Sequence, residues 1–170
     1  HHAAPRGVRP RQVMASVMES MPRVVPDLVV ARALAVPDQV AFQAPGPDDA
    51  WQPWTWSAFA TRVASIAMAL RKSGLGRGQR IAILAPTSME WECVQMAALT
   101  LGVSVVGVDV NYPRALRDEV LRLVPIDGLF VHDAQAAATM PVELVAGLRL
   151  FGRFDTEEAT ALPARALASL

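Results

Sequence analysis

The fold class of this sequence is decided by one stretch, Arg80-Ile81-Ala82-Ile83-Leu84-Ala85-Pro86-Thr87-Ser88. Its first five residues form a short apolar run that is typical of a buried β-strand, and its polar end is typical of a helix start. We predict that helix from about Met89 to Leu101, where Gly102 ends it. The next run, Val103–Val108, is nearly all apolar and rich in β-branched residues, which favours a strand buried on both faces of a parallel sheet.

The same alternation continues toward the C-terminus. Apolar residues recur with helical spacing between Arg114 and Val124, Pro125 ends that segment, and Gly128–Val131 is another short apolar strand. The expected apolar positions of the helix are Leu116, Val120, Leu121 and Leu123. Strands and helices joined by short connections in this order predict a three-layer α/β fold, in which helices flank both faces of a mostly parallel sheet.

A β-hairpin is expected nearer the N-terminus. Gln39–Gln43 has the composition of a short strand, Pro45–Asp49 that of a turn, and Trp51–Trp56 that of the returning strand. A short helix over Leu28–Leu34 precedes the hairpin, with Pro26 ahead of it.

An amphipathic helix is expected to follow the hairpin. Ser57 is the predicted N-cap, because its hydroxyl can accept the free backbone N–H groups of the first turn. Gly74 is predicted to end the helix in the left-handed conformation. The apolar positions that predict its core face are Phe59, Val63, Ile66, Ala67 and Leu70.

We divide the chain into three parts. Residues 1–25 are interpreted as a tag remnant and a leader rich in proline and arginine, where only Val13–Met21 is free enough of proline to form a helix. This part is a leader or a docking helix. Residues 26–135 form the α/β unit. Residues 136–170 are a tail, with a short alanine-rich helix and a strand near Leu148–Phe151, that we expect to continue into a missing part of the protein.

Composition excludes several classes of protein. With 52% hydrophobic and 19% charged residues the chain is not intrinsically disordered. Sixteen basic and sixteen acidic residues balance, so the field that attracts nucleic acid or an anionic membrane is missing. We expect no membrane span, because no apolar run reaches the roughly 18 residues that one requires. The single cysteine, Cys93, lies among apolar residues and is predicted to pack in the core, so nothing favours an oxidising compartment. Because the sequence has neither a membrane span nor the pattern of a signal peptide, we expect a cytoplasmic protein.

The residues that could take part in catalysis or binding do not form a recognisable site. Gly74–Gly78 follows a helix and precedes a strand, the reverse of a phosphate-binding loop, so it is interpreted as a turn. His132 and Asp133 are interpreted as a solvated strand end. Glu90 and Glu92 are two apart on a helix and point to different faces. The tryptophans Trp51, Trp54, Trp56 and Trp91 are assigned to core and edge packing. We assign no catalytic, cofactor-binding or metal-binding residue.

Five segments, in order, resemble the core motifs of adenylate-forming enzymes. Trp54–Phe59 is similar to the opening motif, although Ala58 replaces its usual acidic residue. Gly74–Ile83 resembles the next segment, with Gln79 where aspartate is commonest. The remaining three are Ala85–Trp91, which resembles an Asn-Ser-x-Glu-Trp helix start, Ala97–Asp109, which departs from the usual Val-Pro ending, and Asn111–Pro113 with the helix after it.

The sequence is therefore identified as resembling the N-terminal subdomain of the adenylate-forming (AMP-binding) superfamily of acyl-CoA synthetases and fatty-acyl-AMP ligases. The likeness covers residues 26–135, and its Glu-Trp pair and Asn-Tyr-Pro loop favour carboxylic acyl ligases over peptide-synthetase modules. It implies a parent enzyme that uses ATP and Mg²⁺ to convert a carboxylic acid, by preference a fatty acid, into acyl-AMP and then a thioester of coenzyme A or another thiol. The phosphate-binding loop of such enzymes follows the matched region, so this chain is expected to be inactive alone and to bind none of these cofactors tightly.

Two interpretations of the chain stay open. As a ligase fragment, the chain is expected to expose an apolar surface to the remaining subdomains of the parent, its expected partners, and to self-associate through that surface. As a stand-alone module, it would instead bind a partner or small ligand without catalysis. A small doubly wound nucleotide-binding protein is disfavoured, because the turn Leu84–Met89 contains no glycine.

Overall fold

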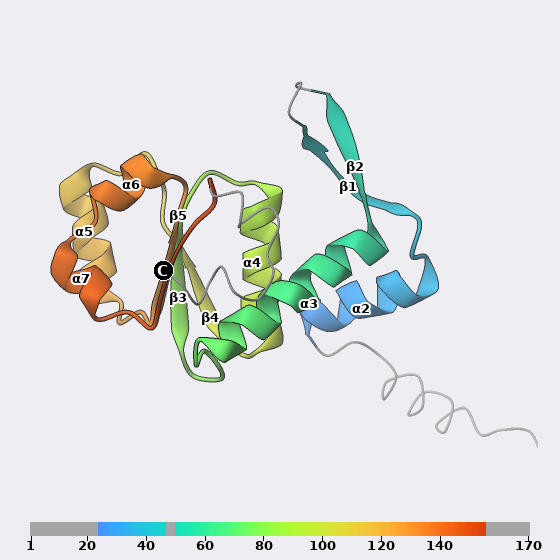
Figure 1. The fold of residues 1–170 in the computed structure, drawn as a ribbon, viewed down its shortest axis with the longest axis horizontal. Helices are drawn as coiled ribbons and strands as arrows, with labels where there is room; N and C mark the ends of the chain where they lie inside the picture. Colours follow the sequence, from blue (N-terminus) through green and yellow to red (C-terminus); the bar gives the residue numbers. More distant parts are fainter. Residues whose placement is uncertain (1–23, 47–49, 156–170) are drawn as a thin grey trace, which may run out of the picture.

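The core of the molecule is a four-stranded parallel sheet (Figure 1). The computed structural model describes residues 24–46 and 50–155. In this part of the chain the strand order is β4 (Ser104–Gly107), β3 (Arg80–Leu84), β5 (Gly128–Val131) and β6 (Leu150–Arg153). All three neighbouring pairs are parallel. The predicted strands at residues 80–84 and 128–131 are confirmed with the same bounds.

Helices cover both faces of this sheet, which confirms the three-layer α/β prediction (Figure 1). One face carries α3 (Trp56–Lys72) and α4 (Met89–Thr100). The other carries α5 (Arg114–Leu123) and two short helices, α6 (Ala134–Ala138) and α7 (Val142–Ala146).

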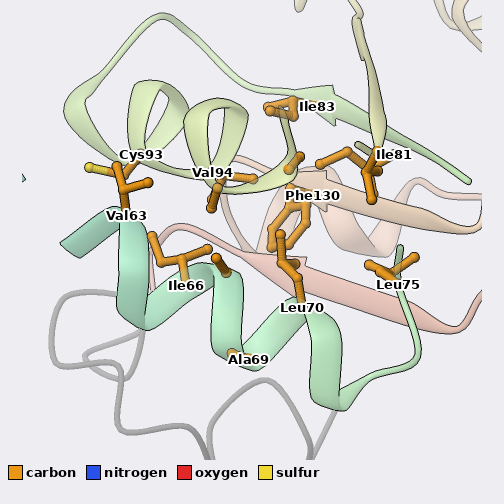
Figure 2. Close-up of a cluster of buried hydrophobic side chains, with 14 of the residues drawn as sticks. Val63, Ile66, Ala69, Leu70, Leu75, Ile81, Ile83, Cys93, Val94 and Phe130 are labelled. Carbon is orange, nitrogen blue, oxygen red and sulfur yellow. The ribbon is translucent and has the colours of Figure 1, made fainter. Parts of the chain in front are cut away.

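Alternate residues of the central strands supply two separate cores. Ile81, Ile83 and Phe130 point toward α3 and α4, where they pack with buried residues such as Leu70 (Figure 2). The intervening strand residues, among them Leu129, face α5 and the helices beside it. This period of two is what a strand buried on both faces requires. The five apolar positions predicted for the core face of α3 are all buried.

The expectation that the strand at residues 103–108 is buried on both faces is borne out only in part. β4 lies at the edge of the sheet, where Ser104 and Gly107 are exposed and the two valines between them are half-buried. Val103 and Val108, just outside the strand, are the buried residues of this segment. Val105 packs against the core on the α3 and α4 side and Val106 against the core on the α5 side, so both faces of this edge strand are covered in part.

The predicted hairpin is confirmed and stands apart from the main sheet (Figure 1). Its strands β1 (Val40–Pro45) and β2 (Trp51–Thr55) are antiparallel. Phe42, Ala44 and Trp54 of the hairpin pack against the core. The ring of Phe42 meets that of Phe59 in α3 edge to face, with 4.9 Å between the ring centroids. Before the hairpin lies α2 (Val25–Ala35), which contains the predicted helix at residues 28–34.

The N-cap of α3 differs from the prediction. Thr55, not Ser57, is the cap, and its hydroxyl accepts the backbone N–H of Ala58 at 3.2 Å. Ser57 lies inside the helix, and its Oγ is 3.1 Å from the Oγ1 of Thr55. At the other end Gly74 has a φ of 81°, which confirms the predicted left-handed residue.

Two further differences concern the C-terminal half. Leu116 and Leu123 of α5 are exposed, and of the four predicted apolar positions only Leu121 is fully buried. The helix α5 packs on the sheet along a narrow stripe of residues. The spacing of its apolar residues therefore predicted a wider buried face than the structure has. The predicted strand near residues 148–151 is β6, which begins two residues later and joins the main sheet beside β5. The predicted helix at residues 13–21 lies outside the described residues.

Within the described residues, none of the helices has the length and apolar character needed to cross a bilayer.

Candidate functional site

The strand order of the main sheet reverses beside β3. The chain leaves β3 for β4 on one side and then returns to β5 on the other side. In parallel α/β sheets, ligands bind in the crevice outside the carboxyl ends of the strands at such a reversal. The segments that follow β3, β4 and β5 meet at this edge and enclose two open hollows, which share Pro86 and Val110.

The first hollow has a volume of about 360 Å³. Its apolar part comes mostly from the end of β3 and the segments after β3 and β4, and its polar part comes from α5, the segment after β5 and the two ends of α6. The lining residues are Leu84, Pro86, Val110, Arg117, His132, Asp133, Gln135, Ala136 and Thr139.

The guanidinium of Arg117 makes four hydrogen bonds at the rim of this hollow. Its guanidinium donates to the Oδ1 of Asp118 at 2.8 and 3.0 Å and to the Oγ1 and backbone oxygen of Thr139 at 3.1 and 3.2 Å. Only 12% of the Arg117 side chain is exposed, and 14% of Asp118, so the pair is largely shielded from water. These bonds hold the guanidinium in one orientation at the rim, with its charge balanced by Asp118.

The second hollow, of about 450 Å³, lies on the α4 side of the same edge. Trp91 and Thr87 border it from the start of α4, and Asp109 and Asn111 border it from the segment after β4. The Oδ1 of Asp109 accepts the backbone N–H and the side-chain Nδ2 of Asn111 at 2.8 and 3.0 Å, which closes this segment into a tight turn. An indole and a fixed carboxylate therefore line a hollow of mixed polarity.

His132 and Asp133 both border the first hollow, but each also serves the fold. The backbone N–H of His132 donates to the carbonyl of Leu84 at 3.1 Å, and its side chain is exposed. The Oδ1 of Asp133 accepts the N–H of Ala136 at 2.7 Å and so caps α6. The Asp133 carboxylate is therefore used as a helix cap.

The loop Gly74–Gly78 lies at the opposite, amino edge of the sheet, just before β3. Gly74 and Gly78 have positive φ angles, and the N–H of Gly76 donates to the Oε1 of Gln79 at 2.7 Å. The loop is thus a turn held by its own following side chain. It lies at the other end of β3 from the crevice.

Cys93 packs in the core as predicted, with 1% of its surface exposed (Figure 2). Burial raises the pKa of its thiol from 9.0 to about 12, and Glu90 and Glu92 add to this rise while Arg62 opposes it. A thiol with so high a pKa is not a nucleophile at neutral pH. Glu90 borders a small hollow of about 90 Å³ beside Cys93, and Glu92 is not part of its lining.

We asked whether the described residues could bind a nucleoside triphosphate with Mg²⁺. Within residues 24–46 and 50–155 there is no group of three acidic, histidine or cysteine side chains able to hold a metal ion. The turn from β3 into α4 contains no glycine that would let its backbone approach a phosphate closely. The crevice offers one guanidinium, already paired with Asp118. The described residues therefore do not fit a nucleoside triphosphate with Mg²⁺, and we assign them no role in phosphate chemistry.

Sequence reasoning missed the crevice. Its polar rim joins Arg117 and Thr139, which are 22 residues apart and on separate helices, and no local pattern links them. A usable signal was present in the residues that directly follow each apolar strand, such as Pro86, Asp109 and His132, because carboxyl ends of parallel strands share one edge.

Comparison with known proteins identifies relatives of this chain. The hybrid PKS-NRPS synthetase thnA of Trichoderma harzianum is 28% identical over 97 residues, 57% of this chain and 2% of that protein. The putative acyl-CoA synthetase YngI of Bacillus subtilis is 29% identical over 88 residues, 52% of this chain and 16% of that protein. The chain therefore spans a small part of the length of both curated relatives.

A solved structure shares the fold. The NpsA N-terminal subdomain of Klebsiella oxytoca, in complex with 3-hydroxyanthranilyl-AMSN, superimposes with a TM-score of 0.59 at 25% identity. The alignment covers 68% of this chain and 28% of that chain. The family model described as AMP-binding enzyme matches residues 29–164. Because that match spans most of the sequence, the chain belongs to the AMP-binding enzyme family and supplies part of the N-terminal subdomain of the adenylate-forming superfamily.

Proposed function

We propose that this chain is the N-terminal portion of an ATP-dependent ligase that activates a carboxylic acid as its acyl-adenylate and then transfers the acyl group to a thiol. The observation that carries the proposal is the match of residues 29–164 to the AMP-binding family on a parallel sheet with a crevice at its carboxyl edge. The likeness to a putative acyl-CoA synthetase over 52% of the chain supports it.

The chemistry requires groups that the described residues do not supply. The carboxylate oxygen of the acid attacks the α-phosphorus of ATP, the bond to the β-phosphate oxygen breaks, and pyrophosphate leaves. A thiolate then attacks the acyl carbon and releases AMP. Neutralising the phosphates of ATP with Mg²⁺ is electrostatic work. We assign this work to the remainder of the parent enzyme. This chain alone should therefore be inactive and bind neither ATP nor coenzyme A tightly.

The role proposed for this chain is to form one wall of the parent's active region. The crevice at the carboxyl edge is a fixed, partly apolar surface, because Arg117 and Asp109 are each locked by their hydrogen bonds. Such a wall can orient an acyl or nucleotide group that the remaining subdomains hold. A fatty acid, coenzyme A as the acceptor and a cytoplasmic location are the finer parts of this proposal, supported by the Glu-Trp and Asn-Tyr-Pro segments and by the single buried cysteine.

The test is pyrophosphate release. The 170-residue chain and its full-length parent are each incubated with ATP, Mg²⁺ and a panel of fatty, aryl and amino acids. We expect the parent alone to release pyrophosphate, with the fatty acids as its best substrates. Release with amino acids only would keep the ligase and overturn the fatty-acid assignment.

Two further outcomes would contradict the main proposal. Pyrophosphate release by the isolated chain would show that the chemistry lies within these 170 residues. If neither protein released pyrophosphate with any acid, the chain would instead be a non-catalytic binding module.

A further inference from the structure

The two ends of the main sheet carry opposite charge, although basic and acidic residues balance in the chain as a whole. Because neighbouring strands are parallel, the segments that enter them share one end of the sheet, the amino edge (Figure 1). These entering segments are residues 71–80, 100–104, 122–128 and 147–150. They contain one acidic residue, Asp127, and six basic residues: Arg71, Lys72, Arg77, Arg80, Arg122 and Arg149.

The carboxyl edge, where the crevice lies, has the reverse balance. The segments that leave the strands hold three arginines and twice as many acidic residues: Arg114, Arg117 and Arg153, and Glu90, Glu92, Asp109, Asp118, Asp133 and Asp155. Helix dipoles account for part of this separation, since acidic residues start α4 and basic residues end α3 and α5. They do not account for Arg77, Arg80 and Arg149, which lie outside the helices.

The cations of the amino edge form one continuous surface. A Cβ on Gly74 would lie 3.5 Å from the Nη1 of Arg149, so this guanidinium lies against the turn that follows α3. The Nη1 of Arg80 donates to the carbonyl of Pro125 at 2.9 Å, which ties the start of β3 to the loop after α5. Arg80 is half-buried, and the other five cations are exposed. Asp127 lies 3.6 Å from the Nε of Arg149, so it balances one of the six charges.

The remaining positive charge attracts an anionic surface, whatever the net charge of the chain. Clusters of four to eight basic residues are typical of surfaces that bind anionic phospholipids. The amino edge also exposes an apolar side chain, because Leu123 follows Arg122 and is 74% exposed. Cations beside an exposed leucine match the boundary between lipid headgroups and hydrocarbon.

A nucleic acid matches this surface less well. It offers no apolar layer to receive Leu123. The four entering segments, all of them described, also contain no aromatic side chain on which a base could stack. The observations therefore favour a lipid surface.

We propose that the amino edge of the sheet is a docking surface for an anionic phospholipid bilayer. The basic side chains lie on the lipid headgroups, and Leu123 enters the boundary of the hydrocarbon. The crevice then faces the aqueous phase, because it lies at the other end of the same strands. Docking of this kind needs no ligase activity, so its failure and the failure of the proposed function can be told apart.

The first test is vesicle binding by the full 170-residue chain. Vesicles of phosphatidylcholine with one-third phosphatidylserine are compared with pure phosphatidylcholine vesicles by co-sedimentation. We expect binding to the anionic vesicles alone. Binding should be lost between about 0.1 M and about 1 M salt, because the Debye length falls from about 10 Å to about 3 Å. Equal binding to both kinds of vesicle would overturn the proposal.

Charge reversals locate the binding surface. Arg77→Glu should weaken vesicle binding by roughly tenfold, and Arg77→Glu combined with Arg122→Glu by roughly a hundredfold. Arg77→Gln only removes a charge and should have an effect of about fivefold. The control is Arg114→Glu, which makes the same charge change on the carboxyl edge at a side chain that is 68% exposed, and it should leave binding unchanged. The arginines before residue 24 are the same in every variant.

Two results of these reversals would contradict the proposal. Equal affinities for Arg77→Glu, Arg114→Glu and the unaltered chain would place the lipid contact elsewhere in the protein. Tighter binding to a duplex oligonucleotide than to the anionic vesicles, weakened by the same reversals, would assign the amino edge to nucleic acid. Urea midpoints of all variants show whether each one is folded.

An environment-sensitive fluorophore gives a second readout that needs no charge reversal. The label is attached to Leu123→Cys or, as the control, to Val110→Cys at the crevice, which is 44% exposed. The native Cys93 is buried and stays unlabelled. With anionic vesicles we expect a blue shift and a rise of roughly twofold in fluorescence at residue 123, and neither at residue 110. The same response at both positions, or none at residue 123, would overturn the proposed docking.

Discussion

The carboxylate of Asp127 accepts the backbone N–H of Arg80 at 3.0 Å, and this hydrogen bond joins two segments that are 47 residues apart. The backbone N–H of Asp127 in turn donates to the carbonyl of Arg80 at 2.7 Å. The same carboxylate lies 3.4 Å from the Nε2 of Gln79 and 3.6 Å from the Nε of Arg149. One side chain therefore fixes the starts of β3 and β5 and approaches the start of β6.

Replacing Asp127 should loosen this amino edge. Asp127→Ala leaves the N–H of Arg80 without its acceptor, so we expect a loss of about 1–2 kcal/mol in the free energy of unfolding. Urea denaturation measures it. Asp38→Ala, at an exposed site before β1, is the control and should change stability by less than about 0.5 kcal/mol. Equal effects of the two substitutions would show that the Asp127 network is not a stabilising contact.

The N-cap of α3 can be assigned by a matched pair of substitutions. Thr55→Ala removes the oxygen that accepts the N–H of Ala58 and should cost about 1 kcal/mol. Ser57→Ala, two residues later, leaves that bond in place and should cost a few tenths of a kcal/mol. Thermal unfolding of both variants decides between them. The reverse ranking would restore Ser57 as the cap.

The two glycines of the turn before β3 should respond differently to a methyl group. A Cβ at Gly76 or at Gly78 meets no atom within 4 Å, but only Gly78 has a left-handed φ, of 85°. Gly78→Ala should therefore destabilise the chain by about 1–2 kcal/mol through backbone strain. Gly76→Ala should be neutral or slightly stabilising, because it restricts the unfolded chain. Equal melting temperatures for the two variants would argue against backbone strain as the cause.

Cys93 should give the chain a dependence on alkaline pH. Its pKa is raised by burial from 9.0 to about 12, so the folded state keeps the thiol protonated where the unfolded state ionises it. The stabilising effect is complete below about pH 9 and is lost as the pH rises toward 12, with a slope of up to about 1.4 kcal/mol per pH unit. As the pH rises from about 8 to about 10, the unfolding free energy of the native chain should fall more steeply than that of Cys93→Ala. Parallel curves of unfolding free energy against pH for the two proteins would contradict the predicted effect of Cys93.

The proposed role of the crevice can be tested in the parent enzyme. Val110 borders both hollows, so Val110→Trp should fill part of each and lower kcat/KM by roughly tenfold. Val142→Trp, on the exposed surface of α7, is the matched control and should have no effect. An unchanged kcat/KM in Val110→Trp would remove the crevice from the active region while leaving the ligase assignment intact.

Central strands were predictable from the sequence because Ile81–Leu84 of β3 and Leu129–Val131 of β5 each belong to one of the two cores. Short apolar runs such as Gly128–Val131 have no other use than burial on both faces. The exposed position of β4 was not predictable in the same way, because it depends on which side of β3 the chain takes at each crossover. Composition along the strand does not encode that choice.

The candidate site was less predictable than the fold. The sequence indicated that Asp133 lies at the end of a strand. Its role as the N-cap of α6 depends on a helix of only five residues. The orientation of Arg117 depends on Thr139, a residue of no distinctive pattern. Contacts between separate elements set the geometry of the crevice, and a periodic pattern within one element carries no information about them.

The central position of β3 has a consequence for biosynthesis. β3 is the first strand of the main sheet to be made, yet its hydrogen-bonding neighbour β5 lies about 47 residues further along. At translation rates of about 5–20 residues per second, the apolar segment Ile81–Leu84 waits roughly 2–9 s for that neighbour. During this interval the edge that β5 will occupy is open, and the face opposite α3 and α4 stays uncovered until α5 is made; such segments recruit other nascent chains. Ribosome-associated chaperones should therefore bind this protein most strongly after residue 84 and release it once β5 has emerged.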